Sequence, residues 1–349
     1  MDAVTKSSLL ELIDEAVQQG WTHRRACEVL EVKETRAWRW RERRAGAGLE
    51  DLPAGGHPVH GLLDEEQAEI VALFEQWGET DRSHRKLAHR GSYLGRIWVS
   101  ASSVKRVLAA QGLCLAAPKR TGRSERRPFP EWATYTKCSI WIFDATHFQR
   151  CRDASATAIM DLVTRKWLAT IVSGEETSTQ IQVVFTEALE SEGLWDLIGA
   201  RADGLVDLNA EDPLRPILLA VSDNGPQMRS GSTREFMAMC AIAQHFGRPG
   251  TPTDQAWIES LFSHVKTEWP HLDHIADPAE LRAELEIIRK EYNTVRLHAG
   301  IGYVTPDDEH EGRGPAIRKA RQEGLEQARQ RRIEYHRDHR QSPGSPNVD

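Results

Sequence analysis

Three carboxylates are the residues of this chain whose types and spacing could do chemistry: Asp144, Asp223 and Glu259. Asp144 lies inside an apolar run (residues 139–148), Asp223 directly follows another (residues 217–222), and such runs predict buried strands. Glu259 lies in a stretch that predicts a helix. Carboxylates held close together repel one another unless hard cations lie between them. The triple therefore predicts magnesium ions that clamp a phosphodiester.

The chemistry would depend on two metal ions. Phosphodiesters hydrolyse very slowly, so the enzyme must lower the barrier by a large amount. Two ions roughly 3.5–4 Å apart can activate a nucleophile and stabilise the leaving oxygen. We expect Asp144 to bridge both ions, because a central strand holds its carboxylate rigidly, with Asp223 on one ion and Glu259 on the other. No Ser, Cys or Tyr nucleophile is required, so no covalent intermediate between the protein and its substrate is expected.

The segments around these carboxylates resemble the DDE catalytic core of bacterial insertion-sequence transposases, the "IS three" family and its relatives, and of retroviral integrases. The gap of thirty-five residues between Asp223 and Glu259 is the signature of that superfamily. A lone Asp-Asn-Gly would be weak evidence, because those residues also favour turns. The resemblance covers roughly residues 64–306 and includes further motifs in the family's order: Ile159-Met-Asp-Leu-Val-Thr-Arg-Lys166, Ser222-Asp-Asn-Gly-Pro226, Phe262-Ser-His-Val-Lys-Thr-Glu268, and a closing motif, Tyr292-Asn-Thr-Val-Arg-Leu-His298 with Thr305-Pro306.

This resemblance implies a fold, an activity and partners. The fold would be α/β, with a ribonuclease-H-like core of a mixed five-stranded sheet with helices, preceded by all-α helix-turn-helix units. The activity would be DNA cleavage and strand transfer, with water as the nucleophile in cutting and a DNA 3′-hydroxyl in joining. The implied cofactor is Mg²⁺ or Mn²⁺, two ions. The implied partners are double-stranded DNA, both element ends and target, and further copies of the chain, because two DNA ends must be brought together.

Hydrophobic periodicity predicts the elements that must position the carboxylates. A three-stranded meander followed by alternating helices and strands agrees with the ribonuclease-H-like order. Seventy-eight residues separate Asp144 from Asp223, more than we expect for the family, and Leu194–Pro213 is interpreted as an acidic surface insertion. The expected strands are 138–148, 156–163, 167–173, 217–222 and 242–246, and the expected helices cover residues 181–189, 233–241 and the segment of Glu259.

The N-terminal residues predict a helix-turn-helix. Apolar residues repeat at helical spacing from Leu9 to Val17, Gly20 ends that helix, and Thr22 can cap a second one. A third, basic helix is expected at Glu34–Arg44, in the position of a helix that enters a major groove. A three-helix bundle with no DNA role would show the same pattern. The arginines that we expect to bind DNA are Arg36, Arg39, Arg41 and Arg43.

A second helical unit is predicted at Asp64–Trp77, Ser83–His89 and Ser100–Gln111. It resembles the second helix-turn-helix that precedes the core in many insertion-sequence transposases. The 349 residues are enough for two or three domains. We expect a helix-turn-helix domain (1–46), a linker (47–63), a second helix-turn-helix-like domain (64–115), a basic linker (116–133), the integrase core with its closing motif (134–306), and a basic C-terminal helix with a disordered tail (307–349).

The chain has a net charge of −7, but it contains three basic segments. Residues 24–44 carry a net +4, residues 119–127 also +4, and residues 313–340 carry +5, so the rest of the chain carries −20. Basic segments can neutralise phosphates and release counterions. Solvated helix faces are the ordinary alternative. We expect the Arg-rich segment Ile317–Arg340 to serve DNA or subunit contact.

Other residues near the carboxylates have predicted roles. Lys266 lies seven residues after Glu259 on the same helix face, and either meets a phosphate or is an ordinary exposed lysine. Asn224 can shape the loop beside Asp223, and Arg248 is expected to touch DNA. The family pattern has Asp-Asn-Ala where this chain has Asp254-Gln255-Ala256. Gln255 keeps the amide group of that asparagine but has a longer side chain, so its contact with the metal-binding residues would differ from the family's.

Several other residues could be mistaken for site residues. Asp161 is expected to organise a hairpin and the pair Glu175-Glu176 to be unrelated to the metals. Trp141 and Trp257 are interpreted as core residues, since apolar residues adjoin each. No chemical step can be assigned to Arg296 or His298 of the closing motif.

The remaining composition indicates a cytoplasmic, nucleoid-associated protein. The five cysteines are scattered, as in reduced cytosolic chains, and no apolar run reaches the roughly 18 residues that span a membrane. His57 and His60 have a zinc-module spacing, but no paired cysteines follow, so zinc is not expected.

Two further functions fit parts of the sequence. One is a DNA-binding regulator of transposase descent that no longer cuts, against which the three intact carboxylates argue. The other is a host nuclease of ribonuclease-H-like fold, against which the N-terminal helix-turn-helix units argue.

Overall fold

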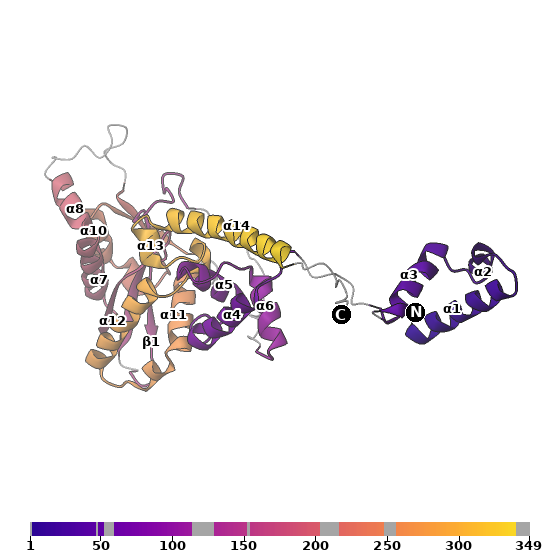
Figure 1. The fold of residues 1–349 in the computed structure, drawn as a ribbon. Coiled ribbons are helices and arrows are strands. Elements are labelled where there is room, and N and C mark those ends of the chain that lie inside the picture. Colours follow the sequence, from indigo (N-terminus) through magenta and orange to yellow (C-terminus); the bar gives the residue numbers. More distant parts are fainter. Residues whose placement is uncertain are drawn as a thin grey trace. The chain divides into compact units, whose positions relative to one another are not determined.

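The computed structural model describes residues 2–46, 48–51, 59–113, 129–151, 154–202, 216–247 and 256–339. The chain forms two compact units, Met1–Gly61 and Leu62–Asp349 (Figure 1). Within the described ranges, no helix combines the length and the apolar character that crossing a membrane requires.

The first unit contains the three expected helices: α1 (Ala3–Gln18), α2 (His23–Val29) and α3 (Glu34–Ala45). Thr22 caps α2 as predicted, because its side chain accepts the backbone N–H of Arg25 at 3.2 Å. The helices enclose one apolar core, which contains Leu10, Ile13, Ala26, Ala37 and Trp40.

The second unit begins with three helices, α4 (Asp64–Trp77), α5 (His84–Tyr93) and α6 (Ala101–Ala110). The helix expected at Ser83–His89 is longer than predicted, since α5 contains Gly91 and ends at Tyr93. The reason is packing: Gly91 lets Ile97 approach α5 so closely that an added Cβ would lie 2.6 Å from Ile97 Cγ2.

A five-stranded sheet forms the centre of the second unit, in the order β3-β2-β1-β4-β5. The strands β1 to β3 form an antiparallel meander, while β4 pairs in parallel with both β1 and β5. This order confirms the ribonuclease-H-like fold. The strands are β1 (Ile140–His147), β2 (Ser155–Asp161), β3 (Trp167–Ser173), β4 (Leu218–Ser222) and β5 (Ile242–Phe246).

Helices cover both faces of the sheet (Figure 1). On one face, Trp141 and Phe143 of β1 pack with α7 and α10. On the other face, Ile140 and Ile142 pack with α11 and α12. Adjacent residues of β1 therefore face opposite layers. The remaining helices are α7 (Ser178–Ser191), α8 (Leu194–Ala202), α9 (Pro226–Arg229), α10 (Gly231–Met239), α11 (Ala256–Glu268), α12 (Pro278–Thr294), α13 (Pro306–His310) and α14 (Gly314–Asp338), with 3₁₀ turns η2 (Pro270–His274) and η3 (Ala299–Ile301).

The segment interpreted as an acidic surface insertion, Leu194–Pro213, begins with the helix α8. Leu194 and Ile198 pack against the apolar cluster of the α7 face, so the start of this segment is part of the folded core. Its residues 203–213 lie outside the described ranges.

Candidate active site

The register between β1 and β4 places Asp144 beside Asp223. The two strands are parallel, and Ile142 of β1 pairs with Val221 of β4. Asp144 follows Ile142 by two residues, and Asp223 follows Val221 by two, so the same register continued brings the carboxylates side by side. Strand residues two apart share a face, so Asp144 belongs to the face that α11 covers. The carboxyl ends of parallel strands are where open α/β sheets place their ligands.

Glu259 reaches this edge of the sheet from the first turn of α11. Its side chain is exposed, while the opposite side of the helix is buried against the sheet. The charges of both Asp223 and Glu259 act on the carboxyl group of Asp144. The fold thus brings the three carboxylates into electrostatic contact. The helix is anchored by apolar residues of the sheet-facing cluster, Ile258, Leu261, Phe262 and Val265.

Burial raises the pKa of Asp144 to about 6. The neighbouring charges of Asp223, Glu259 and Glu176 act in the same direction. A hydrogen bond of 2.8 Å from the Ala145 backbone N–H opposes them and lowers the pKa. A divalent cation would cancel this repulsion and replace the lost hydration. The donor set, which consists only of hard carboxylate oxygens, therefore fits magnesium or manganese.

Magnesium binding is expected to weaken as the pH falls through about 6. Because the pKa of Asp144 is raised, its carboxyl group becomes protonated below that pH, and the metal must displace the proton. The apparent affinity should fall by up to about tenfold per pH unit below the pKa. Calorimetric titration of the protein with magnesium across this range measures the effect. An affinity that does not change with pH would show that Asp144 is not a ligand.

Hydrogen bonds shape the loop that carries Asp223. The Gly225 backbone N–H donates to Asp223 Oδ1 at 2.8 Å, and a Cβ on Gly225 would lie 3.0 Å from that oxygen. The side-chain amide of Asn224 donates to the Gly247 carbonyl at 2.6 Å. Asn224 therefore ties this loop to the end of β5, and a larger residue in place of Gly225 would crowd the carboxylate.

A family model described as an integrase core domain matches residues 240–306, which include Glu259 and the closing motif. A transposase for insertion sequence element IS904 from Lactococcus lactis subsp. lactis (strain IL1403) is 30% identical over 95 residues. Over these residues the chain is similar to the insertion-sequence transposases. The alignment spans 27% of this chain and 38% of the Lactococcus transposase, so the match covers well under half of that protein.

Solved integrase structures show a more distant similarity. The catalytic core domain of BIV integrase is 16% identical, with a TM-score of 0.36, over 51% of this chain and 97% of that one. A simian T-cell lymphotropic virus intasome matches at 16% identity and a TM-score of 0.39, over 68% of this chain and 74% of that one. The HTLV-2 integrase catalytic core in complex with magnesium is 19% identical, with a TM-score of 0.35, over 50% of this chain and 97% of that one.

Lys266 of α11 is engaged by the protein itself. Its ammonium donates to Thr146 Oγ1 at 2.8 Å and to the His147 carbonyl at 2.7 Å, and it lies 5.2 Å from the ring centroid of Phe148. The interpretation as an ordinary exposed lysine is therefore wrong, because Lys266 is half-buried and fixes α11 to the end of β1. A contact between Lys266 and a phosphate stays a prediction.

Two expected site residues, Arg248 and Gln255, lie outside the described residues. One residue that the sequence analysis set aside belongs near the site. The charge of Glu176 acts on Asp144, and its carboxylate lies 2.9 Å from His147 Nε2. No spacing signal marks Glu176, because it reaches Asp144 only when the segment between β3 and α7 folds against the end of β1.

Asp161 and Trp141 behave as predicted, and Trp257 is half-buried against the sheet-facing cluster. Asp161 is fully buried and organises the β2–β3 hairpin, since its carboxylate accepts the backbone N–H groups of Cys138, Val163 and Thr164 at 2.6, 2.8 and 2.8 Å. Trp141 is fully buried in the core.

The structure divides the four arginines of α3 that we expect to bind DNA into two pairs with different environments. Arg41 is half-buried and forms an ion pair with Asp14, while Arg43 donates to the carbonyl of Glu50. These two guanidinium groups stabilise the first unit. Arg36 and Arg39 are exposed, as is Trp38 between them, at 61%. A DNA contact along α3 would therefore depend mainly on Arg36 and Arg39.

The closing motif is a joint between the first three helices of the second unit and the core. Arg296 forms an ion pair with Glu268 at the end of α11, and Arg90 of α5 donates to the Val295 carbonyl at 2.8 Å. His298 is half-buried, and its ring accepts the Gly300 backbone N–H at 3.1 Å. The motif thus holds α5 against the helix that carries Glu259, which gives its residues a positional role.

Several arginines of α14 bind other parts of the second unit. Arg321 donates to the carbonyls of Gly302 and Tyr303, each at 2.8 Å. Arg332 donates to Glu66 Oε2 and to the Trp98 carbonyl, each at 2.7 Å. The expectation that the Arg-rich segment as a whole serves DNA or subunits is wrong for these two residues, because their guanidinium groups hold α14 against the second unit.

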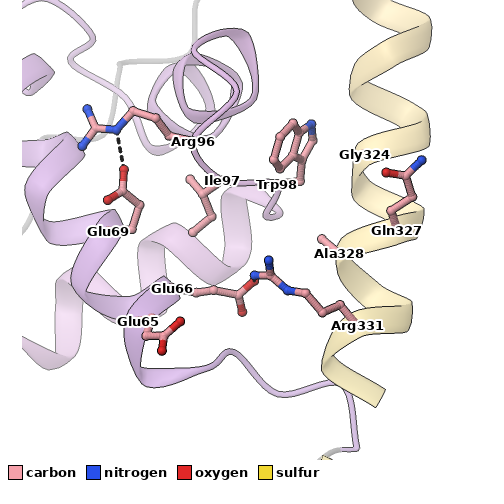
Figure 2. Close-up of a pocket in the computed structure, with 10 residues that line it drawn as sticks. All are labelled: Glu65, Glu66, Glu69, Arg96, Ile97, Trp98, Gly324, Gln327, Ala328 and Arg331. Atoms are coloured by element: carbon pink, nitrogen blue, oxygen red, sulfur yellow. Dashed lines mark hydrogen bonds and ion pairs between the residues drawn. The ribbon is translucent and has the colours of Figure 1, made fainter. Parts of the chain in front are cut away.

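A cavity of about 390 Å³ lies between α14 and the α4–α6 helices (Figure 2). Glu65, Glu69 and Arg96 line one side, and Gln327 and Arg331 line the other. It lies away from the carboxylates, so it is not part of the candidate active site.

The described residues contain one group with a different metal-like donor set: Cys138, Glu192 and His310. Glu192 already accepts hydrogen bonds from His310 Nε2 at 2.6 Å and from the Lys166 ammonium at 3.1 Å. Burial alone would raise the pKa of Glu192, but the hydrogen bond and charge of His310 and the charge of Lys166 lower it to about 2. The carboxylate is therefore paired, and we interpret the group as a polar cluster that fixes α7 to α13.

Proposed function

We propose that this protein is a DDE transposase. It would bind the terminal inverted repeats of its element, cleave DNA strands and transfer them to target DNA. The observation that supports this proposal is the meeting of Asp144, Asp223 and Glu259 at the carboxyl ends of β1 and β4. The raised pKa of Asp144 adds to it, because a strained carboxylate cluster is unfavourable without a cation.

Asp144, Asp223 and Glu259 would hold two Mg²⁺ or Mn²⁺ ions. When bound, such ions supply an activated nucleophile and charge stabilisation at the leaving oxygen. The protein's part is to hold its carboxylates in place. Asp144 is fixed within a central strand, and the hydrogen bond from Gly225 orients Asp223. The nucleophile would be water in the cutting step and a DNA 3′-hydroxyl in the joining step.

DNA recognition would come from the helical units. In the first unit, Arg36 and Arg39 are the exposed arginines of the group predicted for α3. In the second unit, α6 exposes Lys105 and Arg106. Transposition requires two DNA ends in one complex, so the active form would be a dimer or larger assembly on DNA. We also propose that the chain has the six segments expected from its sequence, which run from the helix-turn-helix domain (1–46) to the basic C-terminal segment (307–349).

A strand-transfer assay tests the function. Wild-type protein and Glu259→Gln would be compared on DNA that flanks the native gene, with magnesium and with manganese. We expect joined products from the wild type and at least about a hundredfold less from Glu259→Gln, because the amide supplies no negative charge to a metal. DNA binding without joining by the wild type, with both metals, would instead favour the DNA-binding regulator.

A further inference from the structure

In the first unit, a tight turn joins α2 to α3. Residues 30–33 separate the two helices, and Glu31 in this turn has a left-handed backbone, with a φ of 53°. The Val32 backbone N–H donates to the Cys27 carbonyl at 2.9 Å, and both side chains are buried in the core of the unit. Two helices joined by three or four residues form the arrangement of a helix-turn-helix, in which the second helix enters the major groove of DNA.

One side of α3 packs in this core, and the opposite side faces solvent. Ala37 and Trp40 are buried in the core. At about 100° per residue, Thr35, Trp38 and Arg39 lie within about 100° of one another around the helix, on the side opposite these two. All three are exposed, and the Trp38 side chain is 61% exposed, more than any other tryptophan among the described residues. A large apolar ring therefore projects from the solvent-facing side of a basic helix.

The charges on this side of α3 suit a DNA groove. Arg39 has no carboxylate partner among the described residues, and its Nε donates to the Thr35 carbonyl at 3.2 Å, which directs the side chain towards the start of the helix. The acidic residue of the first turn, Glu34, is held by α2, since its Oε1 lies 3.3 Å from His23 Nδ1. Glu42 lies in the second half of the helix, beyond the N-terminal residues that contact base edges in a helix-turn-helix. The first half of α3 thus presents an aromatic ring beside an available guanidinium group.

An apolar side chain on a helix in the major groove has one specific partner. The base pairs present hydrogen-bond donors and acceptors there, together with the C5-methyl group of thymine. That methyl group is the apolar group that projects into the groove, so an indole ring gains contact area over thymine and not over the other bases. A guanidinium group on the same side binds guanine or a phosphate. Trp38 and Arg39 therefore have complementary partners on one DNA edge.

We propose that Trp38 contacts a thymine methyl group in the major groove of the element's terminal DNA and so sets part of the sequence specificity of this protein. The proposal rests on the proposed function, which takes DNA as the ligand of α3. It adds a base-specific contact to the arginines expected there, because an arginine on a phosphate positions the helix without selecting a base. A second copy of the chain that buried the same ring would be a different occupant, and the test separates the two.

The test compares the full-length wild type with Trp38→Ala and Trp21→Ala. Trp21 is also an exposed tryptophan of the first unit, at 47%, but it precedes α2 and is not on α3. Affinity would be measured for two fluorescent duplexes from the native gene's flanks, one with thymine and one with deoxyuridine, which pairs identically but has no methyl group. We expect the wild type and Trp21→Ala to bind the thymine duplex at least about fourfold more tightly, since one buried methyl group contributes on that scale. The preference should be about fourfold smaller in Trp38→Ala. An equal preference in Trp38→Ala and the wild type would overturn the contact.

Two further measurements on the same preparations test other roles of the ring. Trp38→Ala should melt no lower than the wild type, because the ring is exposed and alanine has the higher helix propensity. A lower melting temperature with equal losses of affinity for both duplexes would show a structural role and count against the proposal. The mass of Trp38→Ala in solution, measured by light scattering without DNA, should equal that of the wild type. A smaller assembly with an unchanged thymine preference would show that a second copy covers the ring and would overturn the proposal.

These outcomes separate the thymine contact from the function. Wild-type protein that joins DNA while Trp38→Ala keeps the full thymine preference refutes only the contact. Wild-type protein whose thymine preference depends on Trp38 but that joins nothing refutes the transposase and keeps the contact. Wild-type protein that binds no DNA refutes both.

Discussion

Replacing Asp144 with asparagine is expected to reduce DNA strand cleavage at least about a thousandfold, which is about 4 kcal/mol of transition-state stabilisation. The negative charges of Asp223 and Glu259 both act on the carboxyl group of Asp144. Its loss would remove the carboxylate that we expect to hold both metals. DNA binding should change little, since the basic residues of α3 and α6 are unaffected. Cleavage and binding assays on the same protein preparation measure the two effects.

Glu176→Gln is the matched control. Glu176 is a carboxylate whose charge also acts on Asp144, but it pairs with His147. We expect cleavage by this variant to stay within about threefold of the wild type, because one exposed charge contributes little. Full cleavage by purified Asp144→Asn would refute the assigned site. Equal losses of cleavage activity in both variants would show that cleavage depends on the total negative charge near the site and not on a metal ligand at position 144.

The same Asp144→Asn variant should be more stable than the wild type without metal. The folded-state pKa of Asp144 is raised, so its carboxylate destabilises the fold above about pH 6, and the cost disappears at low pH, where the group is protonated in both states. Thermal melts at neutral pH would show the gain, and added magnesium should stabilise only the wild type.

Replacing Glu192 with glutamine is expected to lower the free energy of unfolding by about 3–5 kcal/mol, because one partner of a buried ion pair is removed. The Glu192 side chain is 4% exposed and bonds to both His310 and Lys166. Its folded-state pKa is lowered to about 2, so its contribution is present above the ordinary glutamate pKa and is lost as the pH falls towards 2. Denaturant unfolding at neutral and acidic pH measures both effects.

Glu187→Gln provides the control for this prediction. Glu187 is also on α7, but its side chain is 38% exposed and lies 3.8 Å from Arg282. We expect a change within about 0.5 kcal/mol. A loss of stability by Glu192→Gln that is no larger than this, or one that persists unchanged at acidic pH, would contradict a paired carboxylate. A metal requirement for the stability of the wild type would instead indicate that Cys138, Glu192 and His310 bind an ion.

The sequence predicted the order of strands and helices because their hydrophobic patterns are regular. Apolar runs mark β1 and β4, and the runs end close to Asp144 and Asp223. The helix at Ser83–His89 was predicted too short, since a glycine at position 91 carries no sign that Ile97 packs against it. Helix ends of this kind depend on tertiary packing, which local patterns do not contain.

The sequence could not predict which basic side chains pair within the protein and which stay free to bind a ligand. The four arginines of α3 that we expect to bind DNA look equivalent in sequence, yet Arg41 pairs with Asp14 and Arg43 with a backbone carbonyl. The same holds for α14, where Arg332 pairs with Glu66, more than two hundred residues earlier in the chain. A basic segment indicates charge, but only the folded structure decides which charges are already paired.

The sequence by itself determined the three carboxylates, their spacing and the ribonuclease-H-like order, because motif spacing and hydrophobic period are local properties of the chain. The tertiary structure alone decided two features: the approach of Glu176 to Asp144 and the bonding of Lys266 to the end of β1. Each depends on side chains from elements distant in sequence. These contacts follow from how α7 and α11 pack on the sheet, and no pattern within a single element encodes that packing.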